Sequence, residues 1–116
     1  MAAVPLNRFK TIRAGITTET VGIYTCPIGV SAVVLLAQAT NLTADTTAEV
    51  TAYHSRATEA PSDYKIANSA SVPPNDSLNL VPDGRLVLET SDSFKVEASG
   101  ENELNFVLSI LESAKQ

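Results

Sequence analysis

Residues 21–40 read VGIYTCPIGVSAVVLLAQAT, and this stretch decides the fold class. In its first five residues Val21, Ile23 and Thr25 alternate with Gly22 and Tyr24, which is typical of a half-buried strand. Pro27 and Gly29 then break the chain before a second strand at Ser31–Thr40. Because 33–36 carries four consecutive large aliphatics, we expect that strand to be covered on both faces, by the core and by a partner.

The rest of the chain repeats this pattern of short alternating runs between turn residues. Further strands are expected around 50–53, 64–72, 78–80, 86–88 and 94–96, and turns or loops at 41–47, 55–63, 73–76, 82–84, 90–92 and 99–102. About eight strands spaced roughly ten residues apart predict an all-β, antiparallel β-sandwich with a jelly-roll-like arrangement.

The last segment, from Leu104 to about Ile110, fits two structures. Alternate apolar residues favour a strand, whereas the spacing of Leu104, Val107, Leu108 and Leu111 also fits a helix. We favour the strand, because Phe, Val and Ile suit a pleated surface and the preceding loop suits a hairpin.

The length of 116 residues is near the common size of one domain, so residues 1–116 are expected to share a single core. Residues 1–10 are interpreted as an extended N-terminal arm. The arm carries the apolar side chains of Val4, Leu6 and Phe9.

The charge pattern argues against nucleic-acid binding. The net charge is −5, and the eight basic residues are scattered, with only Arg8, Lys10 and Arg13 close together. Non-specific affinity for nucleic acid depends on Lys and Arg neutralising phosphates, so no direct nucleic-acid partner is expected.

Membrane, secretory and disulfide signals are also missing from the sequence. The longest apolar run, Ala32–Ala37, has six residues, whereas a spanning helix needs roughly 20. The first residues do not resemble a secretory signal. Cys26 is the single cysteine, so no intrachain disulfide can form. We expect a soluble chain that is synthesised inside the cell.

Candidate catalytic and metal-binding residues are few. His54 is the only histidine, and a local hydrogen bond at a strand end is its favoured role. Cys26 is interpreted as a small, half-buried residue. A structural zinc site needs about four ligands, so no metal or cofactor is expected. Glu89 and Asp92 flank one turn and form the only candidate cation site, for which a turn-forming role is favoured.

With few candidate catalytic or metal-binding residues, the surface of the protein is the feature most informative about its function. A thin sandwich does not need large aliphatics on both faces of a strand, so the excess apolar side chains predict contacts with other subunits. The candidate interface residues are Val4, Leu6, Phe9, Val34, Leu36, Val107 and Leu111. The alternative is a monomer in which such positions simply belong to the core.

The same segments resemble a known class of proteins. Thr20–Asn41 is similar to small virion structural proteins of tailed bacteriophages, especially marine ones, in which a strand reading Ile-Tyr-Thr-x-Pro-x-Gly leads into an apolar strand ending in Gln-x-x-Asn. Residues 74–80, 84–89, 92–96 and 108–112 are similar too, so the resemblance spans residues 12–112. It implies a β-sandwich subunit repeated in the head shell, neck or tail, and no functional residues carry over.

We therefore expect a non-enzymatic virion structural protein, either a capsid decoration subunit or a neck or tail accessory subunit. Its expected partners are copies of itself, as a homo-oligomer, and a major capsid, neck or tail protein. Its expected location is the virion, assembled in the host cytoplasm. Two alternatives stay open: a carbohydrate- or receptor-binding module with Tyr53 or Tyr64 exposed beside acidic groups, and a hydrolase built around His54.

Overall fold

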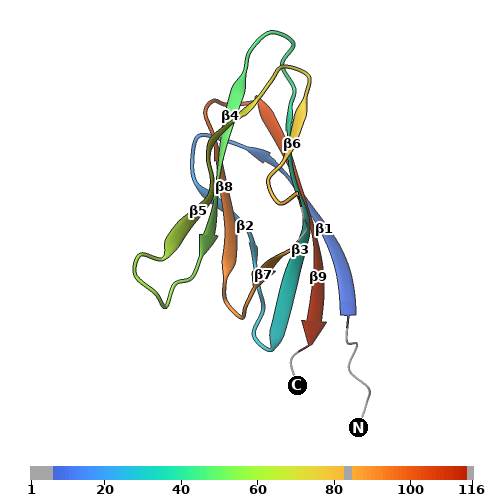
Figure 1. The fold of residues 1–116 in the computed structure, drawn as a ribbon, viewed down its shortest axis with the longest axis vertical. Helices are drawn as coiled ribbons and strands as arrows, with labels where there is room; N and C mark the ends of the chain where they lie inside the picture. The colour runs from blue at the N-terminus through green and yellow to red at the C-terminus, as the bar shows by residue number, and fades with distance from the viewer. Residues whose placement is uncertain (1–6, 83–84, 115–116) are drawn as a thin grey trace.

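The computed structural model describes residues 7–82 and 85–114, which form two antiparallel β-sheets packed face to face (Figure 1). The strands are β1 (Asn7–Ile16), β2 (Val21–Thr25), β3 (Val30–Asn41), β4 (Ala48–Ser55), β5 (Asp63–Val72), β6 (Ser77–Asn79), β7 (Leu86–Leu88), β8 (Ser93–Ala98) and β9 (Leu104–Ala114). The described part of the chain contains no helix that could cross a membrane.

The strand order identifies the topology. One sheet has the order β1-β9-β3, with β6 and β7 both paired to β3, and the other has the order β2-β8-β4-β5. β6 pairs with residues 38–40 and β7 with residues 32–34, so the two short strands occupy one strand position. Eight strand positions, divided four and four between two sheets in these orders, make a jelly roll. The expected fold class is confirmed, as is the strand in the last segment.

β9 lies at the centre of the first sheet. It pairs with β1 from Asn7↔Ser113 to Ile16↔Leu104, and with β3 on its other side. Alternate β9 residues therefore point into the space between the sheets, and Leu104, Phe106, Leu108 and Ile110 are all buried.

The core joins the two sheets through aromatic and aliphatic side chains. Phe94 of β8 stacks on Phe106 of β9, with ring centroids 5.8 Å apart. Both rings are fully enclosed, and smaller residues of β3 and β4 fill the space around them. Close packing of this kind makes the core sensitive to any loss of volume.

A β-bulge in β3 changes the phase of the apolar run at 33–36. The pairing with β9 shifts between Val34 and Leu36, with Leu35 at the irregularity. Val34, before the bulge, pairs with Ile110, points inward and is 0% exposed, while the bulge places Leu36 on the outer face opposite Ser109. The placement of Val34 in a candidate interface is corrected, because the subunit's own core covers it.

The boundary of the N-terminal arm also changes. Residues 7–10 are the first part of β1 and pair with β9, so they are sheet rather than arm. Their alternation is hidden in the sequence because Arg8 and Lys10 occupy positions on the inner face at the strand's end. Val4 and Leu6 lie outside the described residues.

The Phe94–Phe106 stack generates a stability prediction. Phe106→Ala should lower the free energy of unfolding by about 3–5 kcal/mol, because it opens a cavity at the contact between the sheets. Urea denaturation monitored by circular dichroism measures the change. Ile28→Ala is the control, since its side chain is 87% exposed and its effect should stay within about 0.5 kcal/mol. Equal effects of the two substitutions would contradict the packing described.

Candidate assembly surface and polar clusters

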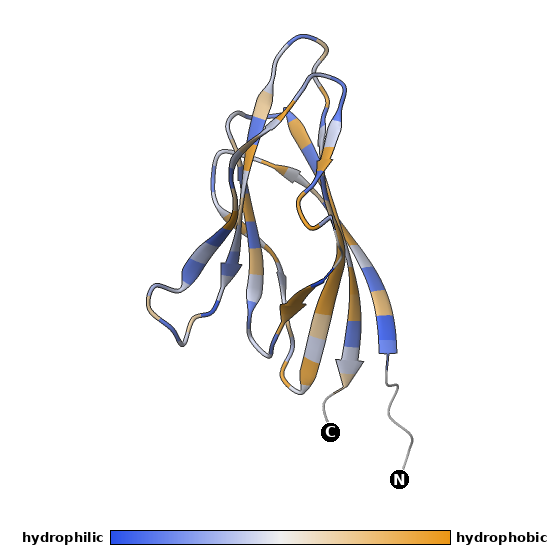
Figure 2. Cartoon of the chain, viewed as in Figure 1, coloured by the Kyte–Doolittle hydropathy of each residue, from blue (hydrophilic) through white to orange (hydrophobic). Residues whose placement is uncertain are grey.

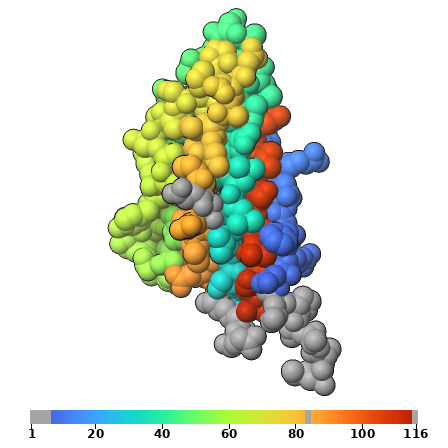
Figure 3. All heavy atoms as spheres, turned by 45° about the vertical axis from the view of Figure 1, so that its right-hand side comes forward, coloured from blue at the N-terminus to red at the C-terminus, as the bar shows by residue number. Residues whose placement is uncertain are grey.

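A row of apolar side chains crosses the outer face of the β1-β9-β3-β7 sheet. Phe9 lies directly opposite Leu111, Leu111 opposite Val33, and Val33 opposite Val87. Directly paired residues point to the same side of a sheet, so the four form a continuous row. Phe9 is 74% exposed and Val87 51%. Figure 3 shows the four strands side by side on this face.

This outer face, made of the outward residues of β1, β9, β3 and β7, is depleted of charge, and we term it the neutral face. Among the outward positions of the described strands β1, β9, β3 and β7, Arg13 alone is charged. Leu35, Leu36 and Val107 extend the apolar row along the strands. The remaining positions are small or neutral: Asn7, Thr11, Gly15, Asn105, Ser109, Ser113, Ser31, Gln38 and Thr40. Depletion of charge with retained apolar residues is characteristic of the buried core of protein–protein interfaces.

The outer face of the second sheet differs. Its outward positions include Glu49, Lys65, Lys95 and Glu97, and Lys95 forms an ion pair with Asp63 at 3.2 Å. Figure 2 shows hydrophobic colouring along β3 and β7 and hydrophilic colouring over much of β5. The two outer faces therefore offer different chemistry to a partner.

A shallow hollow of about 300 Å³ lies between β1 and β9 at one end of the neutral face. Gly15 pairs with Asn105 there, and its lack of a side chain leaves open space above the sheet. Arg13, Phe106 and Val107 complete the lining with their neighbours. The neutral face is therefore concave rather than flat at this end.

The structure brings together four of the sequence-predicted interface residues. Phe9, Leu36, Val107 and Leu111 all lie on the neutral face, whereas Val34 lies in the core. Val33 and Val87 also lie on this face but were not among the interface residues predicted from the sequence. A period of two identifies two faces but not which one is inward, so the pairing of β3 with its neighbours was needed to find them.

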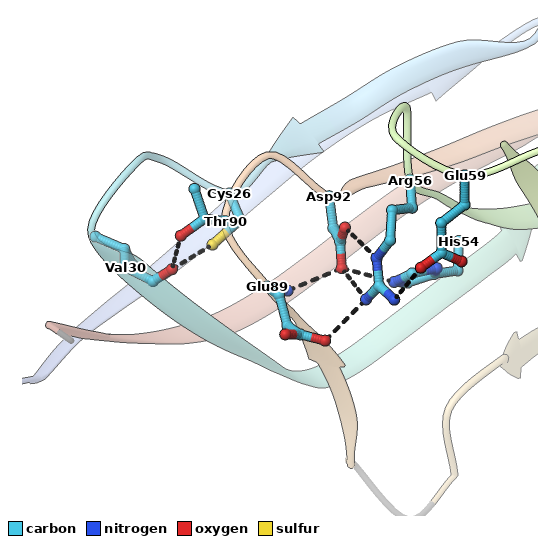
Figure 4. Close-up of polar contacts among 8 residues, drawn as sticks. All are labelled: Cys26, Val30, His54, Arg56, Glu59, Glu89, Thr90 and Asp92. Atoms are coloured by element: carbon cyan, nitrogen blue, oxygen red, sulfur yellow. Dashed lines mark hydrogen bonds and ion pairs between the residues drawn. The ribbon is translucent and has the colours of Figure 1, made fainter.

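A second feature is the polar cluster at Asp92, which joins the end of β4 to the turn between β7 and β8 (Figure 4). The Arg56 guanidinium donates to both carboxylate oxygens, with Nε–Oδ1 at 2.9 Å and Nη2–Oδ2 at 2.7 Å. Oδ2 also accepts from the Glu89 amide at 2.9 Å and contacts His54 Nε2 at 3.0 Å. The Glu89 and Glu59 carboxylates complete the surroundings of Arg56.

These contacts decide the charge state of Asp92, which is 1% exposed. Hydrogen bonds from Arg56 lower the pKa of the Asp92 carboxyl to about 2, against the opposing effect of burial. These contacts agree with the turn-forming role favoured for Glu89 and Asp92, and the Arg56 side chain supplies the positive charge between the two carboxylates.

The His54–Asp92 pair supplies only part of a hydrolytic site. Asp92 is placed to orient the imidazole, but within residues 7–82 and 85–114 no hydroxyl group is hydrogen-bonded to His54. The Cys26 thiol donates to the Val30 carbonyl at 3.2 Å instead. His54 therefore has a hydrogen bond at a strand end, as expected, although its partner Asp92 is distant in the sequence rather than local.

Two tyrosines have their hydroxyl groups engaged by carboxylates. Tyr24 donates to Glu112 at 2.5 Å between the sheets, and burial is the main cause of its raised pKa. Tyr53 donates to Glu97 on the outer face of the second sheet, which raises the pKa of Tyr53 and lowers that of Glu97. Tyr64 is 63% exposed.

The Asn41 side chain at the end of β3 is buried and hydrogen-bonded. Its Nδ2 donates to the carbonyls of Thr46 and Val72, at 2.8 and 2.9 Å, and its Oδ1 accepts from Thr43. The buried side chain thus organises the loop between β3 and β4.

Two solved structures share the fold over nearly the whole chain. A chain from the Bacillus endospore appendages, a family of disulfide-linked pili, is 10% identical with a TM-score of 0.56, and the match covers 96% of this chain and 88% of that one. A chain from the acid-stable capsid of the Helicobacter pylori bacteriophage KHP30 is 9% identical with a TM-score of 0.55, covering 97% and 90%. At such identities the likeness shows the fold alone.

A chain of the cyanophage Pam1 capsid asymmetric unit covers 98% of this chain and 93% of its own length, at 14% identity. Its TM-score of 0.40 is too low to support an argument. No protein-family model matches the sequence, and no curated protein matches it.

The Asp92 cluster generates a pH prediction. Because the pKa of Asp92 is lower in the folded chain than its ordinary 3.8, ionisation favours folding. That contribution, about 2 kcal/mol, is present above about pH 4 and is lost as the pH falls to about 2. Asp92→Asn should remove it at neutral pH and flatten the acid dependence of the free energy of unfolding.

Urea unfolding at a series of pH values between about 7 and 2 measures this dependence. Asp45→Asn, at an exposed position, is the matched control and should keep the wild-type profile. An unchanged profile for Asp92→Asn would show that the cluster does not stabilise the fold.

Proposed function

We propose that this chain is a non-enzymatic structural subunit of a virus particle. The observation that carries the proposal is the neutral face: an uncovered sheet surface crossed by an apolar row, on a subunit whose other sheet face is charged. A surface of this kind is suited to contact with protein, because burying it removes apolar groups from water without desolvating charges.

The fold likeness supports the same proposal. The phage KHP30 capsid chain shares this jelly roll from end to end, and the pilus chain shows the fold in a second kind of assembly. Jelly rolls are also recurrent in viral capsids generally. The sequence resemblance to virion proteins of tailed phages points in the same direction.

Within the particle, we propose that the chain is a capsid decoration subunit, with a neck or tail accessory subunit as the alternative location. Its partners would be copies of itself and a major capsid, neck or tail protein. The mechanism is burial of sheet surface across subunit boundaries, and Val4 and Leu6 are proposed to contribute to such a contact with a neighbour.

A carbohydrate-binding role has less support. Tyr53, one of the two aromatics offered for it, has its hydroxyl group bound to Glu97 and its ring half-buried. The hollow between β1 and β9 lies on the other sheet. The role would require glycan binding that is lost in Tyr64→Ala.

The test is to locate the chain in particles. Purified phage particles whose genome encodes this chain should contain it in many copies by quantitative mass spectrometry, and immunogold electron microscopy should label the head. Labelling of the neck or tail would move the subunit to the alternative location. Particles that lack the chain altogether would refute the virion role.

A further inference from the structure

We propose that the neutral face is the contact between two copies of this chain, stacked face to face about a two-fold axis. This inference rests on the proposed assembly role and names the partner for one surface. The face consists of the outward residues of β1, β9, β3 and β7 and includes, toward one end, the row Phe9, Leu111, Val33 and Val87.

Charge is the first argument for a second copy. The chain carries a net charge of −5, yet no acidic residue occupies an outward position of β1, β9, β3 or β7 in the described structure. Two copies that approached by their acidic surfaces would repel each other. The neutral face lets identical subunits meet without like charges in the contact, and an isologous contact requires a patch that is compatible with itself.

The position of Arg13 orients the pair. Arg13 pairs with Val107 near one end of the face, while Phe9 pairs with Leu111 near the other end. When the strands of the two copies run in opposite directions, each guanidinium lies over the Phe9 end of the other copy and the two Arg13 side chains stay apart. A cation over an aromatic ring is favourable, so this arrangement replaces repulsion by attraction.

The size of the face also fits a dimer. Strands β1, β9 and β3 have 10, 11 and 12 residues, and β6 and β7 share a fourth strand position. At about 3.3 Å per residue and about 4.8 Å between strands, the face measures about 600 Å². Two stacked faces bury about 1,200 Å², which reaches the range of specific, stable interfaces.

The free edge of β1 is less suited to self-association. Arg8 lies on one side of this strand and Arg13 on the other, so edge pairing with a second β1 would bring their four guanidinium groups together, while Lys10 is ion-paired with Glu112 at 3.7 Å. Charged side chains on an edge strand are a known means of preventing such pairing. The face, rather than the edge, is therefore the surface for a second copy.

The experiment uses two glycines as matched positions. A Cβ at Gly15 or at Gly22 meets nothing within 4 Å, so both accept a side chain without strain inside the subunit. Gly15 lies on the neutral face, and Gly22 pairs with Lys95 on the outer face of the second sheet. Gly15→Glu places a carboxylate in the proposed contact, whereas Gly22→Glu adds the same charge elsewhere.

Analytical ultracentrifugation of the full-length chain, at up to about 100 µM, measures the dimer dissociation constant. The wild type and Gly22→Glu should sediment as dimers, and Gly15→Glu should weaken dimerisation by about 10-fold because it adds a carboxylate and its bulk to the contact, next to Arg13. Phe9→Glu should act like Gly15→Glu, while Tyr64→Glu, at a similarly exposed aromatic on β5, should leave the dimer intact.

Cross-linking tests the stacking directly. Ser109→Cys places a thiol near the centre of the neutral face, and the native Cys26 is buried and 1% exposed. Stacked sheets lie about 10 Å apart, so a bis-maleimide of similar reach should link two copies. Ser71→Cys, at an exposed position of β5, should give no cross-linked dimer.

Three results would overturn the inference. One is a wild-type protein that stays a single subunit at the highest concentration. Another is an equal effect of Gly15→Glu and Gly22→Glu. The third is loss of the dimer when residues 1–6 are removed while Gly15→Glu leaves it intact. None of these results decides whether particles contain the chain, so failure of the dimer and failure of the virion role are distinguishable.

Discussion

The structure depends on the double pairing of β9. This strand hydrogen-bonds to β1 on one side and to β3 on the other over nearly its whole length. It thereby joins residues 7–16 to residues 104–113 and sets the register of the first sheet. Because its side chains alternate, one set of β9 residues packs in the core and the other set lies in the middle of the neutral face. A shift of one residue in its register would exchange these two sets of side chains.

The contrast between the outer faces follows from this arrangement. A single jelly roll of this size needs one buried side per sheet. The other side of a sheet usually carries polar side chains. The outer face of the second sheet carries Glu, Lys and Tyr side chains of this kind. The first sheet instead keeps apolar residues on β1, β9, β3 and β7 outside the core. Such residues contribute nothing to the packing between the sheets, which is why their uncovered row indicates a role in assembly.

Polar contacts hold the ends of the sandwich. At one end Asp92 gathers Arg56, His54 and the Glu89 amide, so the turn after β7 is fixed to the end of β4. Toward the other end Asn41 closes the loop between β3 and β4. Both side chains are buried with their hydrogen-bonding groups satisfied, so they stabilise the loops without offering a site for chemistry.

The sequence by itself determined the local structure. Alternation and turn residues predicted the all-β class, the positions of most strands and the breaks between them, because these depend on side chains close together in the chain. Strand β1 was the exception, since Arg8 and Lys10 at its first two inner positions hid where it begins. The tertiary structure alone decided which face of each strand is inward, because the pairing of β9 with strands far away in sequence and the bulge at Leu35 set the phase. That phase moved Val34 into the core and placed Val33 beside Leu111 on the surface, a distinction that a period of two cannot make.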